Sequence, residues 1–125
     1  MALNRALRLR KNSDFQRVRQ QGRSVSSRLL TLVWMPNDLA RVRIGIVVSK
    51  RISKHAVKRN YSKRLLSEAI RPFLPELSGG WDVVLSARSS ILLANLPVLQ
   101  QDVGMLLRRA QLLTPAQMTL PEVSC

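Results

Sequence analysis

The segment from Lys50 to Arg71 constrains the fold most, because it must form a helix while carrying a strongly charged side. It holds eight lysine and arginine residues against one acid, Glu68, and Pro72 makes a helix end at Arg71. On a helix that begins near Ala56, polar side chains recur at steps of three and four and form one stripe: Asn60, Lys63, Arg64, Ser67 and Arg71. The opposite side offers Leu65, Leu66 and Ala69 to a core. Such a helix needs another layer to pack against, and its cations need an anionic counterpart.

Two segments before this helix are predicted to be β-strands. Residues 25–34 are rich in β-formers and alternate loosely, with Leu30, Leu32 and Trp34 on one face. Residues 41–49 alternate more regularly, with an apolar face made of Val42, Ile44, Ile46 and Val48. Between the two segments, residues 36–38 have the composition of a turn. We therefore predict an antiparallel hairpin with one face buried and the other partly open.

Two further helices are expected, one near the start of the chain and one near its end. Ser13 can cap the first helix with Gln16 as its capping-box partner, and Gly22 can end it. The last helix begins at residues 95–97 and carries a regular apolar stripe: Leu99, Val103, Leu106, Leu107, Ala110 and Leu113. Before it, residues 81–87 form a third strand.

This order of elements, αββαβα, predicts the fold class. It indicates an α/β (α+β) two-layer sandwich in which helices pack on a small mixed sheet. The length of 125 residues fits one domain. We assign that domain to residues 1–113, and we expect residues 114–125, which contain two prolines, to form a loose tail.

Positive charge is concentrated in the first part of the chain. The net charge is +14, yet residues 72–125 contain three cations against four acids. Residues 1–71 contain 18 lysine and arginine residues against three acids. Most of the cations are arginine, whose guanidinium group binds phosphate through paired hydrogen bonds and stacks on bases. This excess favours an anionic partner, with nucleic acid well ahead of a membrane surface.

The sequence argues against a membrane or secreted protein. No apolar run approaches the length that spans a bilayer, and the first residues lack the continuous apolar core of a secretory signal. The single cysteine, Cys125, allows neither a disulfide within the chain nor a cysteine metal site. These features fit a reducing compartment, and we expect a cytoplasmic protein.

Catalysis by the side chains of this chain alone is not expected. The one histidine, His55, lies inside the basic segment without a neighbouring acid to orient it. The seven acids are scattered, whereas metal-dependent nucleases gather carboxylates around their ions. Residues 79–80 are glycines but precede a strand rather than a helix, so they do not form a phosphate-binding loop. We therefore predict no catalytic residues and no protein metal site.

Two aromatic residues allow two interpretations each. Phe15 can pack on the sheet as core, or it can line a groove and stack on an unpaired base, a contact worth about 1–3 kcal/mol. Both can hold if the first helix covers the sheet only in part. Arg19, one turn further on, would then flank the groove as a cation. Tyr61 can pack laterally or contact RNA.

The run from Gly45 to Arg71 resembles the bacterial ribonuclease P protein component. In that family, a strand ends in Ser/Ala-Lys-Lys/Arg, and a short loop then leads to a helix that starts with Arg-Asn and a basic pair. The corresponding residues here are Ser49-Lys50-Arg51, Arg59-Asn60, Lys63-Arg64-Leu65 and Glu68-Ala69. The similarity extends over about residues 5–113 through Leu9-Arg10-Lys11, Asp14-Phe15, Gly22, Arg28 and the strand near residues 82–88.

The resemblance implies a role in tRNA maturation. In this family an RNA subunit, with Mg²⁺ bound mainly by RNA, cleaves the 5′ leader from precursor tRNA. The protein subunit helps to position the leader and strengthens functional metal binding. The chain would thus be a subunit of an endonuclease whose partners are the catalytic RNA subunit and precursor tRNA. No organic cofactor, membrane or obligate protein partner is implied.

The resemblance also implies two binding surfaces. Contact with the RNA subunit would use the basic helix and the loop before it, through Arg51, Lys54, Arg59, Asn60, Lys63, Arg64 and Arg71. The leader would bind in the cleft between the first helix and the sheet, at Phe15, Arg19, Arg28, Thr31, Val33 and Lys50. The family further has a left-handed βαβ crossover through the basic helix, whereas general packing rules favour a right-handed one.

Some positions depart from the family pattern. Residue 19 is commonly aromatic but is Arg19 here, so a stacking partner of Phe15 is replaced by a phosphate-binding cation. Ser27 stands where asparagine often precedes Arg28. The lead-in to the helix, residues 53–55, also differs. From the residues alone, an alternative is a ribosomal or RNA-assembly protein that binds a folded RNA without any role in cleavage, and a third is a protein-only nuclease.

Overall fold

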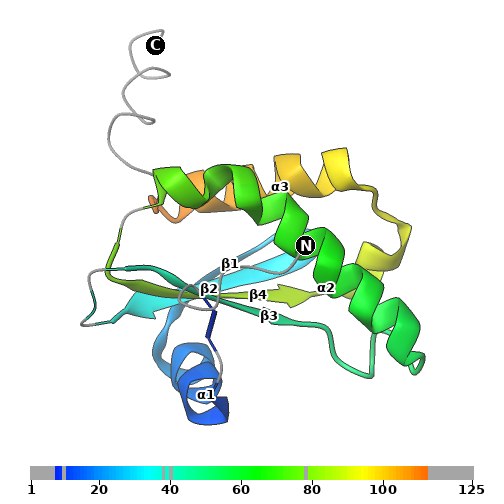
Figure 1. Ribbon diagram of the computed structural model, residues 1–125, viewed down its shortest axis with the longest axis horizontal. Coiled ribbons are helices and arrows are strands. Elements are labelled where there is room, and N and C mark those ends of the chain that lie inside the picture. Colours follow the sequence, from blue (N-terminus) through cyan, green and yellow to red (C-terminus); the bar gives the residue numbers. More distant parts are fainter. Residues whose placement is uncertain (1–7, 10, 38, 40, 78, 113–125) are drawn as a thin grey trace, which may run out of the picture.

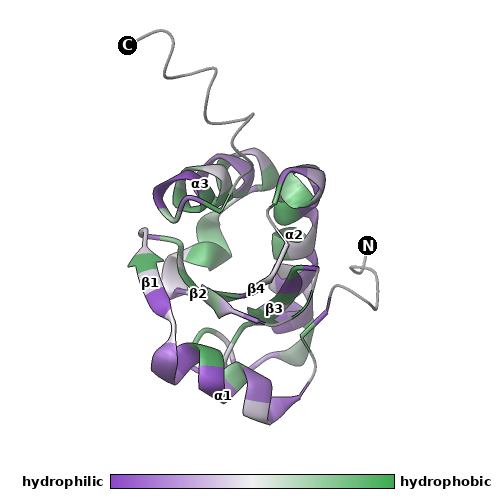
Figure 2. Ribbon diagram, turned by 90° about the vertical axis from the view of Figure 1, so that its left-hand side faces the viewer, coloured by the Kyte–Doolittle hydropathy of each residue, from purple (hydrophilic) through white to green (hydrophobic). Residues whose placement is uncertain are grey.

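A four-stranded mixed sheet forms the centre of the computed structural model, which describes residues 8–9, 11–37, 39, 41–77 and 79–112. The strands are β1 (Arg23–Ser26), β2 (Leu30–Pro36), β3 (Arg43–Val47) and β4 (Trp81–Ala87), in the spatial order β1-β2-β4-β3. Helices α2 (Ala56–Ile70) and α3 (Leu96–Arg109) cover one face of the sheet, and α1 (Asn12–Gln21) lies on the other (Figures 1 and 2). Two short 3₁₀ helices are η2 (Arg71–Glu76) and η3 (Ser89–Leu93).

This architecture confirms the predicted fold class, but the predicted hairpin is wrong. Strand β4 lies between β2 and β3, antiparallel to the first and parallel to the second. The reason is the composition of β4, because Val83, Val84 and Leu85 are completely buried. A strand that is apolar on both faces belongs in the middle of a sheet that has helices on both sides.

The predicted strand over residues 25–34 is in fact two strands. The Ser27 hydroxyl accepts hydrogen bonds from the backbone N–H groups of Leu29, at 3.1 Å, and Leu30, at 3.3 Å. This side-chain turn ends β1 and reverses the chain into β2, which pairs with β1 in antiparallel register. The element order is therefore αβββαβα, with β1 as an additional edge strand.

The sheet separates a large core from a small one. The large core fills the space between the sheet and the pair α2 and α3, and it contains the predicted faces of β2 and β3. The small core lies under α1 and consists of Leu9, Val18, Val33 and Val84, with Phe15 packed against it. Alternation along the strands thus predicted correctly which side chains share a face.

The helix ends agree with the sequence in two cases out of three. Asn95 caps α3 by accepting a hydrogen bond from the Val98 N–H at 3.1 Å. Gly22 ends α1, and a Cβ there would lie 2.5 Å from the Val18 carbonyl oxygen and 2.7 Å from that of Trp34. The capping box is wrong, because α1 begins earlier, with Lys11 at its N-cap and no side-chain cap.

The basic helix and the crossover follow the predicted order. Helix α2 ends at Ile70, one residue before the predicted end, and η2 continues the chain through Pro72. The parallel neighbours β3 and β4 are joined through α2, as a βαβ unit requires. The left-handed crossover stays a prediction. The expected tail over residues 114–125, together with Leu113, lies outside the described residues.

Candidate nucleic-acid interface

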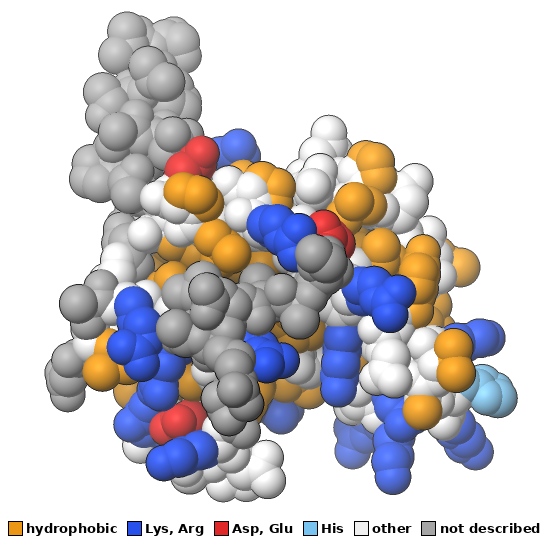
Figure 3. All heavy atoms as spheres, viewed as in Figure 1, with side chains coloured by type: hydrophobic (Ala, Val, Ile, Leu, Met, Phe, Trp, Pro, Cys, Tyr) orange, Lys and Arg blue, Asp and Glu red, His pale blue; other side chains and the backbone are white. Residues whose placement is uncertain are grey.

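The outer side of α2 carries the cations that the sequence predicted. Figure 3 shows lysine and arginine side chains gathered around the end of the molecule where α2 begins. Of the residues predicted to contact an RNA subunit, the solvent-exposed ones are Arg51, Lys54, Asn60, Lys63 and Arg64, whereas Arg59 and Arg71 are partly buried. No acid occupies the first turn of α2, so nothing within that turn offsets the positive end of the helix dipole.

Two residues of the stripe, Arg71 and Ser67, and their neighbour Arg59 are engaged within the protein. Arg59 donates a hydrogen bond from Nη1 to the Ser53 carbonyl at 2.9 Å, which braces the loop before α2. Arg71 pairs with Glu68 at 3.3 Å. Ser67 is buried, and its hydroxyl donates to the Lys63 carbonyl at 3.0 Å. Ser67 therefore does not belong to the exposed stripe, because α2 turns this position toward the protein interior.

A groove follows α1 on the second face of the sheet, and we call it the α1 groove. One hollow of about 400 Å³ lies between α1, β3 and α2, and its lining includes Phe15, Arg19 and Lys63. A second hollow of about 370 Å³ includes Arg19, Thr31 and Val33. Since Arg19 lines both, the two hollows are neighbours on either side of one cation, and the name α1 groove covers both of them.

The structure brings together four of the six residues predicted for the leader. Phe15, Arg19, Thr31 and Val33 line the α1 groove, whereas the side chains of Arg28 and Lys50 are exposed but line neither hollow. Lys63 was assigned to the other surface, yet it lines the groove as well. Sequence reasoning missed several lining residues, among them Gln16, Ser24 and Ser86. Ser86 could have been predicted from its position opposite Thr31, but this position follows only when the pairing of β4 with β2 is known.

Phe15 both packs in the core and lines the groove, and the stacking of its ring on a base stays a prediction. Its ring packs against the small core and over Gly45, where an added Cβ would lie only 2.7 Å from the ring atom Cζ. The same residue is partly exposed and lines the α1 groove. The absence of a side chain at Gly45 therefore lets the ring approach β3 closely, while part of the Phe15 side chain stays exposed.

Asp82 on β4 anchors the helix that forms one wall of this groove. It is fully buried and accepts hydrogen bonds from Arg43 through Nε and Nη2, each at 2.8 Å. Asn37 donates to it at 2.8 Å and Arg17 of α1 at 3.1 Å. Asp14 of α1 lies 3.5 Å from Arg17 and 3.6 Å from Arg43, which closes the network. Ion pairs thus connect Asp14 and Arg17 of α1 to Arg43 of β3 and Asp82 of β4.

This network shifts the pKa values of the buried pair in opposite directions. Burial would raise the pKa of Asp82, but hydrogen bonds from Arg43 and Asn37 and the nearby positive charges hold it below the ordinary value. The hydrogen bond with Asp82 raises the pKa of Arg43. Both groups therefore stay charged at neutral pH, and the carboxylate acts as a structural anchor rather than as an acid or base.

Side chains that could bind a metal ion do not cluster in the part of the chain that the structure describes. Within residues 8–9, 11–37, 39, 41–77 and 79–112, no three histidine, cysteine, aspartate or glutamate side chains lie together in a way that could hold a metal ion. Asp14 and Asp82 do approach one another, but arginines engage both of them. His55 is exposed at the N-cap of α2. In the same ranges no helix is long and apolar enough to cross a membrane.

Known proteins resemble this chain over most of its length. A family model described as Ribonuclease P matches residues 3–111. The ribonuclease P protein component of Chloroflexus aggregans is 43% identical over 113 residues, covering 90% of this chain and 83% of the relative. That of Herpetosiphon aurantiacus is 43% identical over 110 residues, covering 88% and 89%. Among solved structures, the RNase P protein of Staphylococcus aureus has a TM-score of 0.79 at 29% identity, covering 88% of this chain and 100% of that one. The RNase P protein of Thermotoga maritima has a TM-score of 0.70 at 25% identity, covering 81% and 96%.

Proposed function

Because the chain belongs to the ribonuclease P protein family, we propose that it binds the catalytic RNA subunit along α2 and holds the 5′ leader of precursor tRNA in the α1 groove. The observation that carries this proposal is the position of Lys63, which lies on the exposed basic face of α2 and also lines the groove. A leader in the groove would therefore lie directly beside RNA bound to the helix.

The electrostatics of α2 support RNA binding along this helix, most strongly near its N-terminus. Cations lie near the positive N-terminal end of the α2 dipole, and no acid in the first turn offsets them. This arrangement is electrostatically unfavourable in the protein alone. Phosphate groups would relieve this repulsion and accept hydrogen bonds from the exposed side chains. The proposed contacts are Arg51, Lys54, Arg59, Asn60, Lys63, Arg64 and Arg71.

The α1 groove suits a single strand that is held without base readout. Phe15 offers part of an aromatic ring for stacking, and Arg19 lies between the two hollows where a phosphate would pass. Thr31 and Val33 supply the floor. Arg28 and Lys50, which lie outside the groove lining, would contact the leader only beyond the groove. Affinity for precursor over mature tRNA would come from these contacts.

Mg²⁺ is proposed to act where the RNA subunit holds it. The described carboxylates do not fit a protein site for this ion, because Asp14 and Asp82 already pair with arginines. The contribution of the protein would be to place cationic side chains between two RNA molecules, so that fewer metal ions are needed to offset their repulsion. Bond cleavage would be the chemistry of the RNA subunit, in the bacterial cytoplasm where tRNA precursors arise.

Replacing Arg64 with alanine is expected to weaken assembly with the RNA subunit about tenfold, because one charged hydrogen-bond partner of phosphate is lost. The slope of log affinity against log salt should also fall by about one. Filter binding to the cognate RNA subunit across a salt series measures both. Arg109→Ala on the exposed end of α3 is the matched control and should change neither. An unchanged affinity for Arg64→Ala would contradict the proposed docking face.

Replacing Phe15 with alanine is expected to reduce the preference of the assembled enzyme for precursor over mature tRNA by about 1–3 kcal/mol, because a base stack is lost. Phe15→Leu keeps much of the packing on the small core and separates stacking from stability. The measurement is the dissociation constant of each tRNA with the reconstituted holoenzyme. Equal losses for precursor and mature tRNA would contradict a leader site.

A match to the family over residues 3–111 argues against the alternative that the chain is a ribosomal or RNA-assembly protein.

A further inference from the structure

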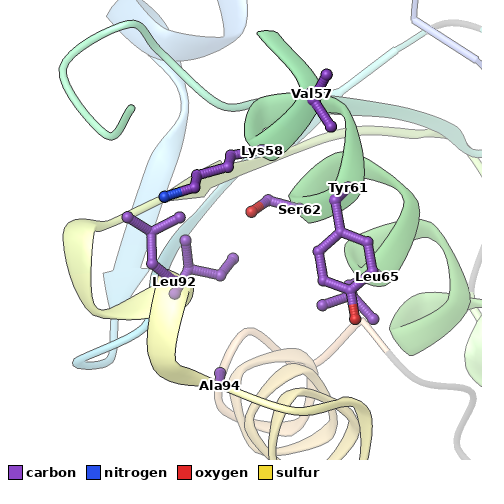
Figure 4. Close-up of a pocket in the computed structure, with 8 residues that line it drawn as sticks. Val57, Lys58, Tyr61, Ser62, Leu65, Leu92 and Ala94 are labelled. Carbon is purple, nitrogen blue, oxygen red and sulfur yellow. The ribbon is translucent and has the colours of Figure 1, made fainter. Parts of the chain in front are cut away.

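A second pocket opens on the side of α2 that faces away from the α1 groove. It has a volume of about 370 Å³, within the range of small-molecule sites, and lies between α2 and η3. Figure 4 shows Tyr61 and Leu65 on one side and Lys58 and Leu92 on the other. The lining is mostly apolar, yet the pocket belongs to the most basic helix of the described chain. No surface proposed above uses it.

The floor of this pocket carries a hydroxyl group. Ser62 is only 2% exposed, and its side chain points into the pocket (Figure 4). The Ser67 hydroxyl on the same helix donates to a backbone carbonyl, whereas no hydrogen bond among the described residues uses the Ser62 hydroxyl. Because no fully buried side-chain N or O atom among the described residues lacks a partner, this hydroxyl is open to the pocket and can hydrogen-bond to a molecule that fills it. An occupant with a polar edge would therefore fit better than a purely aliphatic one.

The exposed part of the pocket is aromatic and cationic. Tyr61 is 59% exposed, so a large part of its ring is available to stack on a planar group. Lys58 stands at the opposite end (Figure 4) and can reach an anion attached to such a group. The charge of α2 disfavours a second copy of the chain, because two such helices would repel each other. A planar ring with hydrogen-bonding edges and an attached phosphate meets all three requirements.

The pocket is also within reach of RNA on the proposed docking face. Residues three apart are neighbours on a helix, so Tyr61 lies beside Arg64 while facing the pocket. A strand whose phosphates contact Arg64 needs to turn out only one nucleotide to bring its base to Tyr61. Unpaired bases in loops and bulges of folded RNA can be turned out in this way.

We propose that this pocket receives one unstacked nucleobase of the RNA subunit. The base stacks on Tyr61, its edge hydrogen-bonds the Ser62 hydroxyl, and Lys58 binds its phosphate. The proposal rests on the proposed function, because it requires RNA along α2. It adds a specific contact with a single base to a surface otherwise made of phosphate contacts.

The first test compares variants of the full-length protein in binding to the cognate RNA subunit. Tyr61→Ala is expected to weaken binding about tenfold, the equivalent of about 1.4 kcal/mol, without changing the salt slope, because stacking involves no phosphate. Ser62→Ala is expected to weaken binding severalfold, and alanine favours the helix at this position. Leu93→Ala is the matched control, since Leu93 is 92% exposed beside the pocket but does not line it, and it should bind as the parent does.

The second test identifies the occupant. With a photo-crosslinking phenylalanine analogue at position 61 of the reconstituted enzyme, we expect a cross-link to one nucleotide of the RNA subunit. A cross-link to precursor tRNA alone or to a second protein copy would overturn the proposal. Normal binding by both Tyr61→Ala and Ser62→Ala would also overturn it. If Arg64→Ala is defective in that case, the proposed function survives without the base pocket, whereas normal binding by all three variants would reject both.

Discussion

Replacing Asp82 with asparagine is expected to lower the free energy of unfolding by about 3 kcal/mol, at the lower end of the range for breaking a buried ion pair. The asparagine has nearly the same shape, so the loss would come from the charge. Arg43, with a side chain only 20% exposed, would keep its own charge beside a neutral amide. Urea unfolding at pH 7 measures the change. Glu76→Gln, at a partly exposed acid outside the network, should change stability by less than about 0.5 kcal/mol.

The effect of this substitution should depend on pH with a definite sign. The pKa of Asp82 is lower in the folded protein than in the unfolded chain. Its contribution to stability is therefore complete when the pH is above the pKa of aspartate in the unfolded chain, about 3.9. It is lost as the pH falls through the lower pKa of Asp82 in the folded protein. The difference in stability between parent and Asp82→Asn should be constant from about pH 5 to pH 7 and shrink below about pH 4. A difference that grows as the pH falls would contradict the assigned role.

Replacing Gly45 with valine is expected to expel the Phe15 ring from its position on β3, which should cost about 1–3 kcal/mol of stability and remove the preference for precursor tRNA. An added Cβ would overlap the ring and lie 3.2 Å from Leu9 Cδ2. The same substitution suits strand geometry in general, so backbone conformation does not explain the loss. Thermal unfolding and the precursor-to-mature affinity ratio measure the two effects.

A double-mutant cycle distinguishes the proposed clash from general strain in the sheet. If the introduced valine side chain displaces the ring, then the effects of Gly45→Val and Phe15→Ala on the free energy of unfolding should not be additive. The reason is that Phe15→Ala removes the ring with which the valine would clash. The double variant should then unfold at a higher temperature than additivity predicts. Strict additivity would show that the two positions act independently, and the ring could not then be held by the gap at Gly45.

The sequence allowed most local structure to be predicted, because the evidence for it is local. The alternation over residues 41–49 and the stripe on α2 each depend on neighbours within one element. The pairing of strands was not predictable in the same way. Strand β3 precedes β4 by more than 30 residues, and only the burial of β4 on both faces placed it at the centre.

The candidate site was predictable in its residues but not in its boundaries. Phe15 and Arg19 could be assigned to a groove because the family resemblance and helix spacing agree. Lys63 could not be placed in that groove from spacing alone, since this requires knowing that α2 passes beside α1 across the edge of the sheet. The pocket at Tyr61 was not predictable from the sequence either, because its second wall comes from η3, which lies far from α2 in the sequence.

The central position of β4 has a consequence for how the protein forms during translation. Strands β2 and β3 do not pair with each other, so neither can join the sheet beside β4 until β4 has been synthesised. Strand β4 leaves the ribosome later than every proposed RNA-binding residue. A nascent chain that stops before residue 81 thus carries the cations without the scaffold that arranges them. Such non-local pairing slows folding. We expect a strongly basic, unfolded intermediate during synthesis, which nearby RNA would attract before the sheet closes.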